Sequence, residues 1–425
     1  MAGTAVNGSD YESLSGYVVI PANTVGPTNV TVRPRYRSNF GFDPIAVFTL
    51  APTNGFVADP DNATVTIPIM DQFPTNPLPI VANPNQVVDL DYSVSEQGLV
   101  LSVNYPVGSY GQYGLPGSVG NFELLSGSGS LTSWDIGVWG LPNEVNMATV
   151  KVSTNGFYAG DAYFIGEGTG TIGWAKHDGS ACNTSWVTLP DETDPEERSD
   201  VYVDKTGLWG NRLLAVTSRY SAGQSDVWGV SISNGQPVAT MIASDLPTAS
   251  AEGLLTLPAE PLTYGPLAGA IVVGNEMTNT LFAIAGNGAV QALNLGVSGM
   301  GVGGQMFQIV PTNQAFYCQD TLSPGPSYIR ELSPAMLQGH LGDILVIQCP
   351  EIQIVDPSTG LPVTLLNPPM IWLLHWNGVS FDARCLILSD LCASDLDSNL
   401  LNFSPPFGLV EKGVFAPLDI PVPAQ

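Results

Sequence analysis

The stretch that decides the fold is EGLLTLP (residues 252–258), followed by LAGAIVVG (267–274), TLFAI (280–284) and VQAL (290–293). Each piece is short, rich in aliphatic or β-branched residues, and bounded by Gly, Pro or Asn, which is typical of a β-strand. The last two pieces are joined by a Gly-Asn-Gly turn, and Asn-Gly is a strong signal for a tight β-hairpin. The stretch therefore predicts four short antiparallel strands in succession.

The same arrangement recurs along most of the chain. Hairpin tips of this kind lie at Asp178-Gly179, Asn234-Gly235, Asn287-Gly288 and Asn377-Gly378, with Gly127-Ser128-Gly129 in the first unit. Neighbouring Asx-Gly tips are 56, 53 and 90 residues apart. The longest gap leaves room for one further unit with an irregular turn near residues 324–326.

Six pairs of middle strands can be counted. They are residues 99–105 with 122–125, 162–165 with 172–176, 213–217 with 227–232, 270–273 with 281–284, 315–319 with 328–332, and 344–348 with 371–376. A four-stranded unit buries its faces only against neighbouring units, so a repeat of this length predicts an all-β, six-bladed β-propeller over residues 87–425. The segment 413–420 resembles the first strand of a unit and is expected to close the ring.

The first part of the chain follows another pattern. Alternating strands are expected at GTAVNGSDY (3–11), GYVVIPA (16–22), NVTVR (29–33), AVFTL (46–50) and ATVTI (63–67). They predict an incomplete β-sandwich over residues 1–71. The segment 72–86 is rich in Pro and predicts an extended linker between the two domains.

The strands of residues 3–71 resemble the Calx-β domain, in which a GTA…GxDY segment precedes a strand ending in IPAG and the last strand reads ATVTI. The resemblance implies an immunoglobulin-like sandwich with calcium ligands, of which Asp10 and Asp71 match acidic positions. PRYRSNFGFD (34–43) replaces an acidic run of the family, and two carboxylates are few for a calcium ion. We therefore expect little calcium binding in this domain.

The family's opening strands are also missing, which predicts an exposed sheet edge. Either residues upstream of this sequence supply the strands, or a second copy or another surface protein donates one by β-strand addition and forms filaments.

Residues 87–420 resemble a bacterial secreted propeller family akin to NHL and SMP-30-type propellers. The matching pieces are LSVNYP (101–106), NFE (121–123), WVTLP (186–190), YVDKTGLWG (202–210), YGPLAG (264–269) and GDIL (342–345). The resemblance implies an extracellular or cell-surface protein joined to other surface modules, and it implies no particular reaction.

Carboxylates precede several of the expected inner strands: Glu144, Glu252 and Glu411, and less clearly Asp200. Inner strands line the central channel of a propeller, so these side chains could converge on its mouth and share a calcium or magnesium ion. Alternatively they are solvated loop carboxylates. The corresponding position of the fifth unit is Gly303-Gly304-Gln305, which interrupts the set.

Three functions remain open. We expect no enzyme, because no nucleophile–base pair or phosphate-binding loop occurs, and the enzyme alternative is a metal-dependent, lactonase-like hydrolase. The leading expectation is a structural or interaction protein of the cell surface. The second is a propeller that binds carbohydrate or another polymer on aromatic residues, for which Trp139, Trp209 and Trp228 are candidates.

Composition narrows the partners. The net charge is −26, with only 12 Lys and Arg, so phosphate backbones and anionic membranes are repelled. No apolar run is long enough to span a bilayer. We expect an extracellular protein whose targeting segment lies upstream. Five Cys predict either two disulfides with Cys182 left over, or five small buried hydrophobes.

Overall fold

The computed structural model describes residues 2–3, 5–7, 11–17, 30–32, 45–50, 63–68, 78–84, 87–103, 122–134, 145–166, 170–190, 192, 198–275, 280–294, 304–321, 327–348, 351–355, 362–366, 370–387 and 412–422. The chain divides into two compact units, Met1–Pro77 and Leu78–Gln425.

The described strands of the first unit form one antiparallel sheet. Its order is β1 (Ala2–Gly3), β2 (Ile45–Thr49) and β3 (Thr64–Pro68). The strands predicted at 46–50 and 63–67 are therefore present, whereas residues 30–32, where another strand is predicted, have no regular structure. Tyr11 and Ala46 form a small core. The described residues make a three-stranded sheet, and the predicted Calx-β sandwich is not shown by them.

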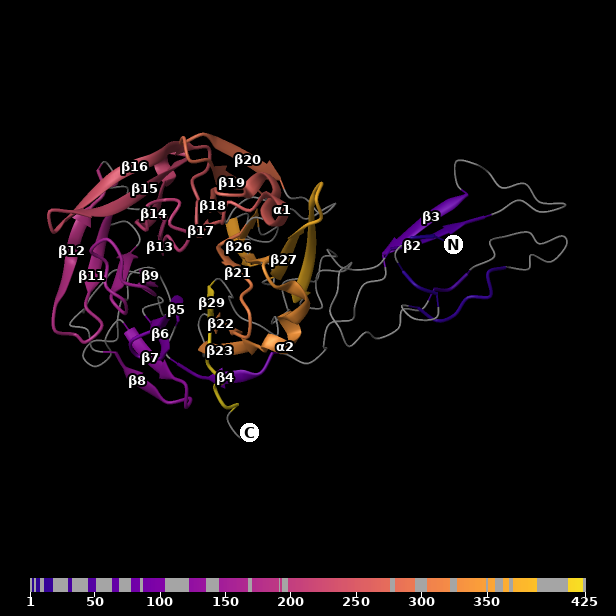
Figure 1. Ribbon diagram of the computed structural model, residues 1–425, viewed down its shortest axis with the longest axis horizontal. Coiled ribbons are helices and arrows are strands. Elements are labelled where there is room, and N and C mark those ends of the chain that lie inside the picture. The colour runs from indigo at the N-terminus through magenta and orange to yellow at the C-terminus, as the bar shows by residue number, and fades with distance from the viewer. Residues whose placement is uncertain are drawn as a thin grey trace. The chain divides into compact units, whose positions relative to one another are not determined.

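The second unit is a six-bladed β-propeller (Figure 1). From inner to outer strand, blades 1 to 6 are β5-β6-β7-β8 (Asp89–Ser93, Gly98–Ser102, Phe122–Ser126, Leu131–Ser133), β9-β10-β11-β12 (Val145–Thr149, Ala162–Gly166, Thr171–Ala175, Cys182–Thr188), β13-β14-β15-β16 (Arg198–Val203, Leu213–Arg219, Gln224–Ser233, Gln236–Leu246), β17-β18-β19-β20 (Leu254–Thr256, Ile271–Val273, Thr280–Ile284, Val290–Asn294), β21-β24-β27-β28 (Met306–Ile309, Ile344–Gln348, Met370–Trp376, Phe381–Ile387) and β29-β22-β23-β4 (Gly413–Ala416, Ala315–Thr321, Ser327–Leu332, Ile80–Ala82). Each inner strand contacts the next, and β29 contacts β5, which closes the ring. The predicted fold class and all six predicted strand pairs are confirmed.

Blade 6 joins the two ends of the propeller segment. Its inner strand β29 comes from the C-terminal part of the chain, as predicted, and its outer strand β4 lies within the segment predicted as a linker. The buried Arg330 of β23 holds this region together, because it pairs with Asp320 of β22 and donates a hydrogen bond to the carbonyl of Leu78 at 2.7 Å. The propeller unit therefore begins before residue 87.

The last two hairpins do not follow the chain order that the repeat predicts. After β21, the inner strand of blade 5, the chain first builds β22 and β23 of blade 6 and then returns to β24 of blade 5. A separate hairpin, β25 (Glu351–Val355) with β26 (Pro362–Leu366), leaves blade 5 between β24 and β27. The hairpins β22–β23 and β25–β26 both lie between the tips at Asn287-Gly288 and Asn377-Gly378, which explains the 90-residue gap.

Short helical turns precede the second strand in two blades. Blade 4 has α1 (Pro261–Tyr264) and η2 (Gly265–Leu267), and blade 5 has α2 (Pro334–Leu337) and η3 (Gln338–His340); blade 3 carries η1 (Tyr220–Ala222) between β14 and β15. No helix in the described part of the chain has the length and apolar character needed to cross a lipid bilayer.

The core consists of layers between neighbouring blades. One cluster joins blades 6 and 1 through Tyr317 and Leu99, and another joins blades 1 and 2 through Phe122 and Phe164. Further clusters join blades 2 and 3, and blades 3, 4 and 5. A blade is thus apolar on both faces, and the polar inner edges of the strands are left to line the channel.

Candidate functional site

Carboxylates clamp neighbouring inner strands across the channel wall. Asp89 of β5 accepts a hydrogen bond from its neighbour Leu90 through Oδ1 (2.7 Å) and one from the backbone of Met147 in β9 through Oδ2 (2.6 Å). Asp91 does the same with the backbone N–H groups of Tyr92 (2.8 Å) and Thr149 (2.6 Å). An inner strand exposes unpaired N–H groups along its open edge, and these carboxylates supply the acceptors.

Asp200 repeats this geometry between blades 3 and 4. Its Oδ1 accepts the N–H of Val201 at 2.7 Å, and its Oδ2 accepts that of Gly253 at 3.2 Å. Its Oδ2 also forms an ion pair with Nζ of Lys412 at 2.9 Å, with both side chains nearly buried. Burial favours the neutral amine of Lys412, but Asp200, Glu252 and Asp89 outweigh it and raise its pKa.

Asp89 is the least compensated of these carboxylates. Burial raises its pKa to about 7, and the negative charge of Asp200 adds to this effect, whereas Lys412 and the two backbone hydrogen bonds oppose it. At neutral pH a larger fraction of this side chain is therefore protonated than of an ordinary aspartate.

Of the residues predicted to hold a cation, the structure describes Glu252, which is buried beside Lys412. Glu144 and Glu411 lie outside the described residues, as do Asp10 and Asp71 of the first unit. In the described part of the chain no cluster of three or more His, Cys, Asp or Glu side chains could hold a metal. The positive charge next to Glu252 and Asp200 is the ammonium group of Lys412.

A cavity lies at the C-terminal ends of the inner strands, away from Lys412, which precedes β29. It has a volume of about 560 Å³ and is reached by residues at or just after the C-terminal ends of all six inner strands. Its lining includes Tyr92, Val94, Lys151, Tyr202, Lys205, Thr206, Leu208, Leu255, Thr256, Pro258, Ala259, Gln308, Ile309, Pro311, Gln314, Val414, Phe415 and Pro417. The cavity is thus mainly apolar and aromatic, with two ammonium groups.

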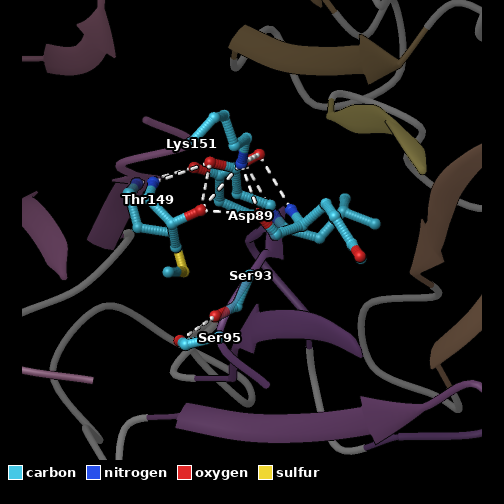
Figure 2. Close-up of polar contacts among 9 residues, drawn as sticks. Asp89, Ser93, Ser95, Thr149 and Lys151 are labelled. Atoms are coloured by element: carbon cyan, nitrogen blue, oxygen red, sulfur yellow. Dashed lines mark hydrogen bonds and ion pairs between the residues drawn. The ribbon is translucent and has the colours of Figure 1, made fainter. Parts of the chain in front are cut away.

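Lys151 is anchored in the wall of this cavity (Figure 2). Its Nζ pairs with Asp91 at 2.7 Å, donates to Oγ1 of Thr149 at 2.7 Å, and donates to the carbonyl of Tyr92. Burial lowers its pKa to about 8; Asp91 opposes this effect and Lys205 reinforces it. Burial alone would raise the pKa of Asp91, but Lys151 and Lys205 outweigh it and hold that pKa below its ordinary value.

Lys205 lies on a turn that a single carboxylate holds in shape. Asp204 accepts the backbone N–H groups of Thr206, Trp209 and Asn211 at 2.9, 3.0 and 3.0 Å. The ammonium group of Lys205 lies 5.1 Å from the ring centre of Tyr202. This turn places the exposed ammonium group of Lys205 at the cavity. Because the turn is already held by Asp204, binding a ligand there need not order it first.

Three other sequence-based predictions can be compared with the structure. Trp228 is buried between blades 2 and 3 and donates to Glu192 at 3.3 Å, and Trp209 packs beside the core of blades 3 to 5. Neither lines the cavity, and Trp139 lies outside the described residues. Cys318 is buried and forms no disulfide, so the prediction of two disulfides with Cys182 left over is wrong. Cys182 is exposed, so the alternative prediction of five buried cysteines is wrong as well.

Two of the three histidines, which are far apart in the sequence, lie close together in the structure. His340 and His375 each place Nδ1 on the carboxylate of Asp343, at 3.0 and 2.7 Å. The three residues fasten η3 to the middle strands of blade 5.

Neither lysine of the cavity was predicted from the sequence, although a signal was present. Lys151 and Lys205 each lie two residues after the last residue of an inner strand, β9 and β13. The same position holds Pro258 after β17 and Pro311 after β21. The cavity therefore has a cationic side on blades 2 and 3 and an apolar side on blades 4 and 5.

These features define a closed six-bladed propeller with a ligand-sized cavity at one mouth of its channel. No protein-family model matches the chain, and no curated protein matches its sequence.

Solved structures match it only weakly. An auxiliary nutrient binding protein from Bacteroides ovatus shares 9% identity over 58% of this chain and 59% of its own, with a TM-score of 0.37. One from Bacteroides thetaiotaomicron shares 8% over 74% and 59%, with a TM-score of 0.34. A fructofuranosidase from Schwanniomyces occidentalis complexed with fructose shares 12% over 73% and 63%, with a TM-score of 0.36. Each match spans less than two thirds of the other chain, and none establishes a function for this one.

Proposed function

We propose that this protein is a non-enzymatic binding propeller of the extracellular space or cell surface, which holds a small ligand or the end of a polysaccharide at the mouth of its channel. The observation that supports this most directly is the cavity of about 560 Å³ to which all six inner strands contribute. Ligand-binding pockets of proteins have volumes of roughly 300–1,000 Å³ and are largely apolar with a few placed polar groups.

The wall of the cavity is organised before a ligand arrives. The clamps from Asp91 to Thr149 and from Asp200 to Gly253 tie neighbouring inner strands together, and Asp204 fixes the turn that bears Lys205. A site of this kind loses little conformational entropy on binding.

The cavity lining also argues for binding over hydrolysis. Among the described residues, those that line it include no Asp, Glu, His or Cys. A lactonase-like reaction needs carboxylate or imidazole ligands for a metal and a group that transfers a proton. Lysines and tyrosines can orient a ligand but do not form such a centre here.

Saturation-transfer NMR with a panel of neutral and acidic saccharides tests the proposal. Ala259→Trp should block the mouth, because Ala259 is exposed and lines the cavity. Ala181→Trp is the matched control, since Ala181 is equally exposed next to the hairpin tip of blade 2. We expect ligand signals that disappear with Ala259→Trp and persist with Ala181→Trp. The proposal would be contradicted if the ligand signals persisted with both substitutions, or if no saccharide of the panel bound to the protein.

A further inference from the structure

Lysine residues are concentrated at the channel of this acidic protein. The chain has a net charge of −26 and only four lysines, Lys151, Lys176, Lys205 and Lys412. Three of them lie along the channel or in the cavity at its mouth, and the fourth, Lys176, pairs with Asp178 at a hairpin tip of blade 2. No arginine among the described residues lines the channel or the cavity, so these three lysines supply the positive charge there.

The two lysines of the cavity are not equivalent. The charge of Lys151 is balanced by Asp91 at 2.7 Å. Lys205 is exposed, and among the described residues no carboxylate lies within ion-pair distance of it. The nearby Asp204 is buried, and its two oxygens are occupied by N–H and O–H groups of its own turn. Counted over the part of the chain that the structure describes, the cavity therefore holds one positive charge more than its walls neutralise.

We infer that the cavity binds a sugar that carries one anionic group, a carboxylate or a sulfate, with that group on Lys205 and the ring against the apolar side. This rests on the proposed function and specifies its ligand. Pro258, Ile309 and Pro311 supply the apolar side of the lining, from blades 4 and 5. The two-sided lining sets the direction of a ligand that is charged at one end and neutral at the other.

The net charge limits the number of anionic groups. A protein of −26 repels polyanions at long range, and the repulsion grows with the charge of the partner. One anionic group can reach a local excess of positive charge, whereas a dense polyanion meets acidic surface on every side. The ligand is thus a singly charged sugar or the acidic end of an otherwise neutral chain.

Matched sugar pairs test the inference by titration calorimetry on the full chain. The probes are glucose with glucuronate, galactose with galacturonate, and mannose with mannuronate, and galactose 6-sulfate serves as the sulfate arm. In at least one pair the anionic sugar should bind about tenfold more tightly, which is the usual worth of one hydrogen bond to a charged group. Lys205→Gln should abolish this preference, Lys205→Arg should retain it, and Lys176→Gln should leave it unchanged.

The outcomes separate the inference from the proposed function. Suppose that neutral sugars bind, that Ala259→Trp blocks their binding, and that no anionic sugar binds more tightly than its neutral partner. The proposed binding function then stands, and the inference of an anionic ligand is wrong. If Lys176→Gln weakens the acid as much as Lys205→Gln, the preference comes from net charge and the site assignment is wrong. If no probe binds at millimolar concentration, both are wrong.

Discussion

Replacing Lys412 by Met should destabilise the propeller strongly and in a way that depends on pH. The Lys412 side chain is 5% exposed and that of Asp200 is 10% exposed, and their charged atoms are 2.9 Å apart. Removing one partner of a buried ion pair leaves an uncompensated charge and costs about 3–5 kcal/mol. Asp200 keeps its two backbone hydrogen bonds, so we expect the lower end of this range at pH 8.

Asp89 gives the effect its pH dependence. Its pKa is already about 7, and loss of Lys412 raises it further. As the pH falls through this raised value Asp89 takes up a proton, which removes one of the unbalanced negative charges. The cost of Lys412→Met should therefore fall as the pH falls from 8 to 5.

Urea unfolding followed by tryptophan fluorescence measures this cost. All eight tryptophans lie after residue 130, so the signal reports on the propeller unit alone. A loss of about 3 kcal/mol shifts the midpoint by about 1 M at a slope of about 3 kcal/mol per molar. Lys176→Met, which removes an exposed pair, should leave the midpoint nearly unchanged. A midpoint for Lys412→Met equal to that of the wild type at pH 8 would refute the argument.

Four further outcomes are expected. Asp89→Asn should flatten the dependence of stability on pH: the raised pKa stabilises the fold fully below the unfolded value of 3.8 and this stability is lost as the pH rises through about 7, so urea midpoints at pH 5 and pH 8 should differ less than in the wild type. Gly253→Ala should cost about 1–3 kcal/mol, because a Cβ there would lie 2.6 Å from the carbonyl oxygen of Gln305, whereas Gly235→Ala, also at positive φ but in open space, should cost clearly less; equal costs in thermal unfolding would contradict this. In calorimetry, millimolar calcium titrated into residues 1–85 of the chain should give no measurable heat of binding. Tight binding would show that this part of the chain does have a Calx-β-like calcium site. Strand addition to the first unit predicts higher oligomers of the full chain in light scattering, and a strictly monomeric protein with an intact first unit is evidence against it.

Local sequence signals predicted the hairpins of the blades because the paired strands of a hairpin are neighbours in the sequence. The hairpin tips at Asn234-Gly235 and Asn377-Gly378 join the third and fourth strands of blades 3 and 5, as the Asn-Gly pattern indicates. The C-terminal strand β29 was predicted from its likeness to a first strand. Each of these inferences needs only a dozen neighbouring residues.

Non-local pairings were not predictable in this way. Strand β4 is three residues long and is flanked by Pro79 and Pro84, so its composition indicates a linker. Proline is compatible with an outer strand, which needs hydrogen bonds on one side only. The pairing of β4 with β23, about 250 residues away, is set by tertiary contacts such as that of Arg330 with Leu78.

Sequence reasoning found channel carboxylates but not the ligand cavity, for a physical reason. Glu252 and Asp200 were singled out as channel carboxylates, and the structure places both beside Lys412. A cation was expected between them, but the sequence cannot tell a metal ion from an ammonium group until the fold brings residue 412 next to residue 200. The cavity at the other mouth depends on residues from six strands, and no single stretch of sequence contains it.

The polarity of the cavity follows from how the inner strands are joined. Between blades 1 and 2 and between blades 3 and 4 the open strand edges are held by Asp91 and Asp200, and buried carboxylates require nearby cations. Between blades 5 and 6 the N–H of Gly413 rests on the sulfur of Met306, which needs no counter-charge. Asp91 has its counter-charge in Lys151 of blade 2, whereas Asp200 has its counter-charge in Lys412, which directly precedes β29 of blade 6. The contact between two inner strands thus decides whether a lysine must lie nearby, and the lysine that balances Asp91 also lines the ligand cavity.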